Sequence, residues 1–336
     1  MMLTRDQQLT LVAQAGRAPS AHNIQPARWR FAGDKVELFE DPARWLSVGD
    51  PTGRDNQIAL GMAWEGMTMA LSTLGLRLTQ PEVSSLPYPP ATQDFRRAAS
   101  ALITSGAGPD PLAAFVDARR AYRGKFLRAT PPQINSLGEC AADHAEFVTL
   151  ASKNSTAQIA QWYDDAAAAG LDDPRFAEEL YHWLRLSPHD PGWPRDGLSA
   201  DCMALSRWEA WGASIALRPR VIRLLSALSL TRLLASESAK VKSAARIVLI
   251  HAAPDVTSFD IGRRWYRFWL AMTARGFAGV PMSALADSPG HAALLAESQR
   301  LPRRNRLVNI MRFGPVPVRG IPRSARLPTA ELMQAS

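Results

Sequence analysis

Near its start, the chain changes from a helical to an alternating pattern of apolar residues. Residues 5–16 place apolar side chains near helical spacing, which predicts a helix. From Trp29 to Phe39, apolar and polar residues alternate on both sides of an Ala-Gly-Asp-Lys turn, which predicts a β-hairpin. The intervening stretch RAPSAHNIQP, residues 17–26, consists mainly of small and polar residues and leads into the hairpin.

Two later segments, residues 54–74 and 262–275, are rich in large apolar residues and predict long buried helices. Their sequences GMAWEGMTMALSTLGL and GRRWYRFWLAMTARGF share an order: a glycine, a helix with aromatic residues, then Gly75 or Gly276 with an apolar residue. This weak internal repeat indicates two related halves in one chain. Two unrelated buried helices are the alternative.

The other elements are expected to be shorter. Strands are predicted at 101–104, 147–150 and 247–250, and helices at 112–120 and from Pro131 onward. Residues 81–93 form a proline-rich connection, and residues 155–240 are mostly helical around the loop SPHDPGWPRDG. The overlapping segment 218–242 combines leucines with arginines. Such a segment lies on a membrane, packs on its own protein, or forms a lid or dimer arm.

Composition and charge narrow the classes of function. The chain has 336 residues, is 46% hydrophobic and carries 39 basic against 31 acidic residues, a formal charge of +8. This excess favours anionic ligands, but the arginines are scattered and form no nucleic-acid-binding module. Cys140 and Cys202 offer neither a disulfide framework nor a metal site. The start MMLTRDQQLT lacks the apolar core of a signal peptide, so we expect a cytoplasmic protein without a membrane or nucleic-acid partner.

Four stretches resemble motifs of the flavin-dependent nitroreductase family, most closely its fused two-copy, Acg-like branch. They are PSAHNIQP at 19–26, RRAYRGKF at 119–126, GFAGVPMSAL at 276–285 and RSARLP at 323–328. The resemblance implies an α+β nitroreductase-like fold of two intertwined copies, with antiparallel-rich central sheets flanked by helices. We expect residues 1–108 as the first half and 109–336 as the second, with a helical or lid insertion at about 185–240.

The resemblance also predicts one FMN per chain. In single-copy relatives, the phosphate motif precedes the Pro-Ser-x-x-Asn motif, and the flavin lies between two copies. Here the order is inverted, since Ser20 and Asn23 precede Arg119 and Arg123. This is the order expected of a fused pair that keeps a single interface site.

The expected roles in this site follow from what FMN offers. Guanidinium groups bind its phosphate: Arg119, Arg123 and Arg326, with Arg120 and Arg323 as neighbouring substitutes. Compact polar side chains suit its ring edge and ribityl chain, and a backbone N–H near Met282 and Ser283 is expected at flavin N5. The predicted cofactor-binding residues are Pro19, Ser20, Asn23, Gln25, Arg119, Ala121, Arg123, Pro281, Met282, Ser283 and Arg326.

Some positions depart from the family pattern, and others have local explanations. Ala121 stands where the phosphate motif has serine, and Trp29 lies two places later than the usual Gln-Pro-Trp tryptophan. Ser20 and Asn23 are also common in turns, a single arginine is most often a solvated surface residue, and His22 is interpreted as a loop histidine.

Three functions are therefore open. The first is an FMN oxidoreductase that takes electrons from NAD(P)H or another donor and reduces a nitro, quinone or enone acceptor, or that dehydrogenates a biosynthetic intermediate. Its chemistry needs no catalytic side chain and no metal. The second is a protein that binds or sequesters FMN under a closed lid with little turnover. The third is a degenerate chain without flavin that acts through protein contacts. We expect a monomeric pseudo-dimer or a homodimer acting on a small molecule.

Overall fold

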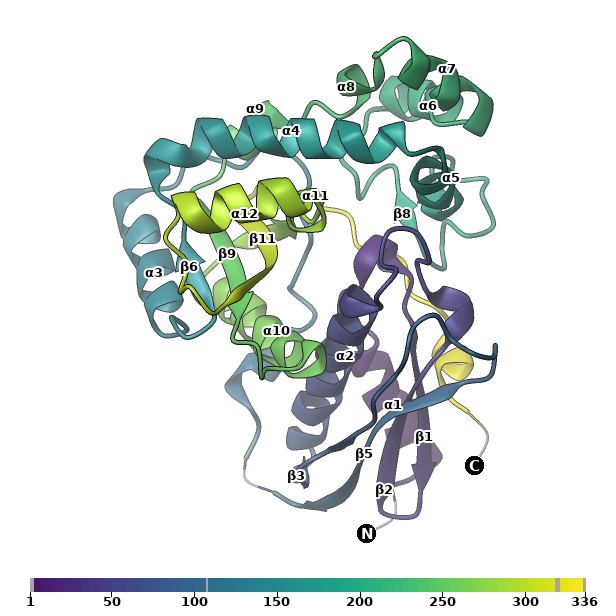
Figure 1. Cartoon of the computed structure of the whole chain (residues 1–336). Helices are drawn as coiled ribbons and strands as arrows, with labels where there is room; N and C mark the ends of the chain where they lie inside the picture. The colour runs from purple at the N-terminus through teal and green to yellow at the C-terminus, as the bar shows by residue number, and fades with distance from the viewer. Residues whose placement is uncertain (1–2, 107, 318–320, 335–336) are drawn as a thin grey trace.

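Two antiparallel sheets form the framework of the computed structural model, which describes residues 3–106, 108–317 and 321–334 (Figure 1). The first has the order β1-β2-β5-β3, with the short β4 also paired to β5, and the second has the order β6-β9-β11-β10. The strands of the first are β1 (Ala27–Ala32), β2 (Lys35–Glu40), β3 (Leu76–Leu78), β4 (Glu82–Val83) and β5 (Arg96–Ser105). Those of the second are β6 (Val148–Leu150), β9 (Arg246–Ala252), β10 (Ala278–Pro281) and β11 (Arg306–Gly314). The expected α+β class with antiparallel sheets is confirmed.

The two sheets are built in the same chain order. The first unit runs α1 (Arg5–Ala15), β1, β2, α2 (Arg54–Ser72), β3, β5, and the second runs α3 (Pro131–Ala142), β6, β9, α10 (Ser258–Ala274), β10, β11. In each unit, the long helix follows the second strand and leads to the strand at the far edge of the sheet. The predicted helices at 5–16, 54–74 and from Pro131 onward are confirmed, as is the hairpin.

The long helices α2 and α10 pack side by side in the centre of the molecule (Figure 1). A Cβ atom on Gly61 would lie 2.0 Å from the Phe259 carbonyl oxygen, and one on Gly262 would lie 2.2 Å from the Ile58 carbonyl oxygen. Each glycine thus faces the residue three places before the other glycine. This reciprocity is the contact pattern of a two-fold interface.

Aromatic side chains fill the core around this crossing. Trp64 of α2 stacks on Trp29 of β1 with ring centroids 6.1 Å apart, and it also contacts Phe259 of α10. Trp265, Phe268 and other apolar residues of α10 belong to the same core, which also includes residues of both sheets. Burial of these large side chains stabilises both units together.

A helical insertion, residues 156–242, separates β6 from β9. It comprises α4 (Thr156–Asp172), α5 (Pro174–Trp183), the strand pair β7 (Leu184–Arg185) and β8 (Leu198–Ser199), α6 (Arg207–Ala216), α7 (Pro219–Ala227), α8 (Thr231–Leu234) and α9 (Ser238–Lys242). Helix α4 packs against α11 (Ala284–Asp287) and α12 (Pro289–Ser298). Helices α6, α7 and α8 lie at the end of the insertion, away from both sheets (Figure 1).

Several sequence predictions need correction. The helix predicted at 112–120 is only a 3₁₀ turn, Pro111–Phe115, capped by the Asp110 carboxylate, because the chain then extends to pair Ala121 with Gly279. The predicted strand at 101–104 is part of the longer β5, and α10 begins at Ser258 instead of residue 262. Helices α11 and α12 and strand β11 were not predicted. No helix in the described ranges has the length and apolar character needed to cross a membrane.

Candidate functional site

The Pro19–Pro26 motif forms a strained loop between α1 and β1. His22, Asn23 and Gln25 have φ angles of 45°, 57° and 54°, in the left-handed region that side chains other than glycine seldom adopt. The Ser20 hydroxyl accepts a hydrogen bond from the Gln25 N–H at 2.9 Å. Such strain persists only where surrounding contacts hold the backbone, and it is concentrated at functional sites.

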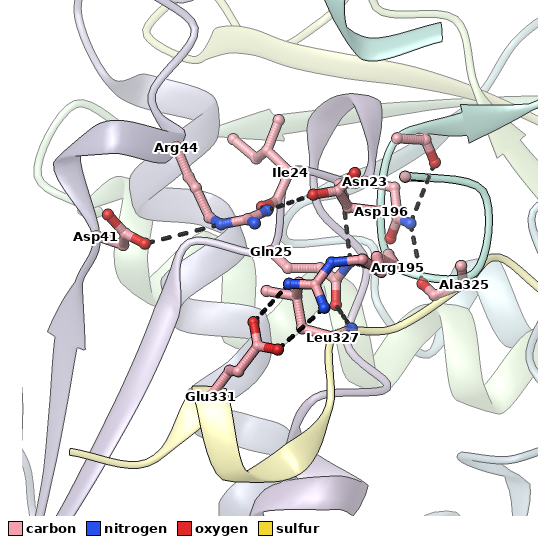
Figure 2. A network of polar contacts seen from close by, with 12 residues as sticks. Asn23, Ile24, Gln25, Asp41, Arg44, Arg195, Asp196, Ala325, Leu327 and Glu331 are labelled. Carbon is pink, nitrogen blue, oxygen red and sulfur yellow. Dashed lines mark hydrogen bonds and ion pairs between the residues drawn. The ribbon is translucent and has the colours of Figure 1, made fainter. Parts of the chain in front are cut away.

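Two amide side chains join this loop to distant parts of the chain, as Figure 2 shows. Asn23 Nδ2 donates to the Gly197 carbonyl at 3.2 Å and to the Ala325 carbonyl at 3.0 Å. Gln25 Nε2 donates to the Arg195 carbonyl at 2.9 Å, and Gln25 Oε1 accepts from the Leu327 N–H at 2.9 Å. The predicted site loop therefore holds both the insertion and the C-terminal segment.

Late-chain arginines meet this early loop. Arg326 Nη1 donates to Asn23 Oδ1 at 2.8 Å, and Arg326 Nε donates to the Gly16 carbonyl at 2.6 Å. Arg326 Nη2 and Arg119 Nη2 both donate to the Arg17 carbonyl, at 3.0 and 2.9 Å. The structure thus brings Asn23, Arg119 and Arg326 together across some 300 residues of sequence.

These two guanidinium groups lack anionic partners. Within residues 3–106, 108–317 and 321–334, no carboxylate forms an ion pair with Arg119, which is buried, or with Arg326, which is half-buried. The Arg119 guanidinium lies over the Trp269 ring, 4.7 Å from its centroid. Burial lowers the pKa of Arg119, and burial with the nearby Arg119 and Arg17 lowers the pKa of Arg326 to about 9. A buried cation without a counterion is costly, so this cluster favours a bound anion.

A small hollow, partly open to solvent, adjoins the cluster. It is lined by Arg17, Val116, Asp117, Arg119, Arg120, Ala121, Pro322, Arg323, Ser324 and Arg326. Its only carboxylate, Asp117, pairs with Arg17 at 3.2 Å and with Arg323 at 3.4 Å. Five guanidinium groups against one carboxylate fit a phosphate group, which guanidinium forks bind with charge-assisted hydrogen bonds. A second hollow includes Pro19, Ser20, Gln25 and Trp29 in its lining.

Arg123 lies apart from the arginine hollow and near His22. In the part of the chain that the structure describes, the Arg123 side chain forms no hydrogen bond or ion pair. Burial lowers the Arg123 pKa. His22 Nδ1 is buried without a hydrogen-bond partner among the described residues, and burial with the Arg123 charge lowers the His22 pKa to about 4. His22 is therefore a neutral imidazole with an unused nitrogen.

Strand β10 positions the segment expected near flavin N5. The Met282 N–H donates to the Ile310 carbonyl at 2.7 Å, and the Ser283 hydroxyl accepts from Asn309 Nδ2 at 2.9 Å. Pro281 has no N–H, whereas the Ser283 N–H has no acceptor among the described residues. The prediction of a backbone donor thus narrows to Ser283. No hydrogen bond in the described ranges joins residues 281–283 to the 19–26 loop.

Sequence reasoning missed several members of this region. Arg17 supplies the carbonyl that Arg119 and Arg326 share, and the Tyr266 hydroxyl lies beside both of these arginines. Tyr266 lies in a segment that the sequence predicts as a buried helix. Because a buried hydroxyl group usually has a polar neighbour, its position could have indicated a polar contact. A carbonyl contact such as that of Arg17 leaves no mark in the sequence.

Comparisons with known proteins give partial matches. No family model matches the chain. It is 40% identical over 80 residues to "Putative NAD(P)H nitroreductase Rv3131" of Mycobacterium tuberculosis, covering 24% of this chain and 22% of that protein. It is 35% identical over 88 residues to "Putative NAD(P)H nitroreductase acg" of the same species, covering 26% of each. The matches thus span about a quarter of the length of these relatives.

The comparison with solved structures finds matches of low TM-score, which include two nitroreductases. The FMN-dependent nitroreductase NfnB from Mycobacterium smegmatis, in complex with NADPH, is 19% identical with a TM-score of 0.38, covering 67% of this chain and 98% of that one. A nitroreductase with bound FMN from Bacteroides fragilis is 13% identical with a TM-score of 0.37, covering 65% and 95%. The sequence matches support the assignment of this chain to the nitroreductase family, which its motifs predicted.

Proposed function

We propose that the chain is an FMN-dependent oxidoreductase. It takes electrons from NAD(P)H or another donor and passes them to a small nitro, quinone or enone acceptor, or dehydrogenates a biosynthetic intermediate. One observation carries this proposal: Arg326 donates to Asn23 and shares the Arg17 carbonyl with Arg119, and no carboxylate among the described residues forms an ion pair with either arginine. The curated relatives named as NAD(P)H nitroreductases support the same class of activity.

The residues present fit FMN in three ways. Arg119, Arg326 and the other guanidinium groups of the hollow would hold its phosphate. The Ser283 N–H and the Arg123 side chain have no hydrogen-bond partner among the described residues, so they would be available to donate to the flavin ring and to an oxygen of the cofactor. When bound, FMN supplies the hydride chemistry, and the protein orients the donor and excludes water. Neutral His22 is available as a hydrogen-bonding group but is not needed as an acid.

We further infer that the chain is a fusion of two nitroreductase-like halves, divided near residues 108 and 109. The matched element order and the reciprocal contacts of Gly61 and Gly262 support this inference. The insertion then comprises residues 156–242, which include the expected 185–240. Residues 16–26, between α1 and β1, carry the Pro-Ser-x-x-Asn motif, whereas the equivalent connection, residues 143–147, is shorter and lacks it. One FMN per chain follows.

A second candidate, an FMN-binding protein with little turnover, is favoured by the closed position of the insertion. Asn23 and Gln25 bind the carbonyls of Gly197 and Arg195, and Asp196 forms ion pairs with Arg44 at 3.0 Å and with Arg185 at 2.7 Å. Figure 2 shows Asp196, beside Arg195, close to the 23–25 loop. These contacts hold the insertion against the site loop and restrict access to it.

A flavin spectrum followed by anaerobic reduction tests these functions. The purified protein should absorb at flavin wavelengths, with one FMN per chain. NADPH or NADH should bleach that absorbance without oxygen if the chain is an oxidoreductase. Bleaching by dithionite alone would favour sequestration or another donor. A colourless protein that takes up no added FMN would reject both flavin functions.

Arg123→Gln is the sharpest test of cofactor binding. Its side chain makes no hydrogen bond or ion pair with the described residues, so the variant should fold normally. Loss of one charge-assisted hydrogen bond, about 1.5–3 kcal/mol, should weaken FMN binding roughly 10- to 150-fold. The matched control is Arg304→Gln in an exposed loop, which should leave the affinity for FMN unchanged.

The double variant Arg119→Ala with Arg123→Ala should lose FMN altogether. Stoichiometric FMN in a folded double variant would show that the phosphate binds elsewhere.

A further inference from the structure

Exposed large apolar side chains are concentrated at the end of the insertion. Of 14 such side chains in the described ranges, eight lie between residues 208 and 234. We call this set the outer face: Trp208, Trp211, Ile215, Leu224, Leu228, Leu230, Leu233 and Leu234. Trp208 is 81% exposed and Leu233 is 76% exposed, which is far from the usual place of such residues. Clustered apolar exposure of this kind marks an interaction surface.

The outer face is formed by three helices that contact one another in sequence. Helix α6 packs on α7, and α7 packs on α8. On α6 the exposed residues Trp208, Trp211 and Ile215 recur at helical spacing, so they share one side of the helix. On α7, Leu224 is exposed while Ile222 is buried, which gives this short helix an outward apolar side as well.

Basic residues flank this apolar surface. Residues 206–236 contain five arginines and one glutamate. Arg232 is paired with Asp165, but Arg207, Arg220 and Arg223 are exposed and have no ion-pair partner among the described residues. The glutamate, Glu209, caps its own helix by accepting from the Ser206 N–H at 2.7 Å. The surface therefore combines tryptophan and leucine with unpaired positive charge.

This combination fits an anionic lipid surface better than a second copy of the chain. Tryptophan is enriched at membrane interfaces, and amphipathic helices with arginines and apolar residues bind anionic headgroups. A symmetric contact between two outer faces would instead bring arginines of both copies together without a free local carboxylate to pair with them. Charge complementarity thus favours lipid phosphate over self-association.

We propose that the outer face docks the protein reversibly on membranes that contain anionic phospholipids. The tryptophan and leucine side chains insert at the boundary of headgroups and acyl chains, and Arg207, Arg220 and Arg223 bind the lipid phosphates. This inference does not depend on flavin binding. It departs from the sequence expectation of no membrane partner, which rested on the lack of a spanning segment.

Vesicle co-sedimentation of the full chain tests the proposal. We expect binding to vesicles of phosphatidylcholine with phosphatidylglycerol, much weaker binding to pure phosphatidylcholine, and loss of binding in high salt because exposed charges are screened. Equal binding to both vesicle types, or none at low salt, would overturn the proposal.

Three variants separate the contributions. Arg220→Gln with Arg223→Gln should weaken binding about fivefold for each arginine removed. Trp208→Ser with Trp211→Ser should weaken it about tenfold or more, through lost apolar insertion. Leu74→Ser with Leu294→Ser, which changes exposed residues outside the outer face, should bind like the unmodified chain.

Sedimentation velocity of the protein without vesicles completes the test. A dimer that the tryptophan variant abolishes, together with no preference for anionic vesicles, would assign the surface to a second copy and overturn lipid docking.

Discussion

The crossing of α2 and α10 and the outer face of the insertion are both helical and rich in large apolar side chains, yet their environments are opposite. At the crossing, Trp64 is 1% exposed and backbones approach so closely that only glycine fits at positions 61 and 262. On the outer face, Trp208 is 81% exposed. There, a Cβ on Gly212 of α6 would have no neighbouring atom within 4 Å.

The difference shows that apolar composition alone does not predict burial within one chain. At the crossing, the partner surface belongs to the same molecule, and the small residues that permit close approach are repeated in both helices. The outer face has no such partner in the described ranges. In this chain, the matching glycines mark the two apolar helices that pack closely on each other, and the outer face lacks such a match.

The largest effect is expected at the crossing. Gly61→Ala places a Cβ 2.0 Å from a backbone oxygen of α10, and Gly262→Ala places one 2.2 Å from a backbone oxygen of α2. Because backbone cannot rotate away as a side chain can, the helices must separate and lose core packing. Each variant should lower the free energy of unfolding by about 3 kcal/mol or more, measured by urea denaturation.

Gly212→Ala in α6 is the matched control for these variants. Its Cβ meets nothing within 4 Å, so the gain in helix propensity should stabilise the insertion by up to about 1 kcal/mol. Equal tolerance of alanine at positions 61, 262 and 212 would mean that the crossing is looser than the structure describes, and the support for two symmetric halves would be lost.

A smaller effect is expected from the pH dependence at the start of α2. Asp50 is buried and accepts from the Asn56 N–H at 2.8 Å. Burial, with the nearby Asp55, raises the Asp50 pKa from 3.8 to about 7. The folded chain therefore holds a proton that the unfolded chain has released between these values. The free energy of unfolding therefore falls as pH rises from about 4 to about 7, and this loss of stability is constant above that range.

Asp50→Asn should remove this dependence, because the amide keeps an acceptor for the Asn56 N–H but carries no charge. Relative to the unmodified chain, the variant should gain about 2–3 kcal/mol of unfolding free energy between about pH 5 and pH 8. Glu209→Gln on α6 is the control. Hydrogen bonds from the Ser206 hydroxyl and N–H hold the pKa of this exposed carboxyl below its usual value, so it stays ionised across this range and its removal should give no such gain. If the difference in unfolding free energy between Asp50→Asn and the unmodified chain stays the same from pH 5 to pH 8, the Asp50 pKa lies near its ordinary value.

The same contrast explains which elements were predictable from the sequence. Helices α2 and α10 and the β1–β2 hairpin have strong apolar periodicity and clear turn or stop residues. They were therefore predicted, and only the start of α10 was placed four residues late. Strand β11 was missed because its pattern contains Asn309 and Arg312, which are buried in the structure. Arg312 donates to the carbonyls of Gly124 and Arg123 at 3.0 and 2.9 Å, a pairing that the sequence does not reveal.

The candidate site was predictable in its members but not in their contacts. The motifs indicated that Asn23 and Arg326 belong to one site, and the structure brings them within hydrogen-bonding distance. Their roles toward FMN stay predictions. The sequence gave no sign that Asn23 and Gln25 also bind carbonyls of the insertion, because every residue has a backbone carbonyl and only the fold selects which ones approach.

The smallest effect is expected on the outer face itself. Trp208→Ser and Leu233→Ser remove side chains that are mostly exposed in the single chain, so each should change the unfolding free energy by no more than about 0.5 kcal/mol. The unfolding free energy is measured by urea denaturation of dilute protein without lipid. A loss of about 2 kcal/mol or more would show that these side chains are covered in solution by protein, which favours a second copy over lipid. A neutral result in solution combined with weaker vesicle binding would show that the outer face is unpartnered in the free protein and acts only when a membrane is present.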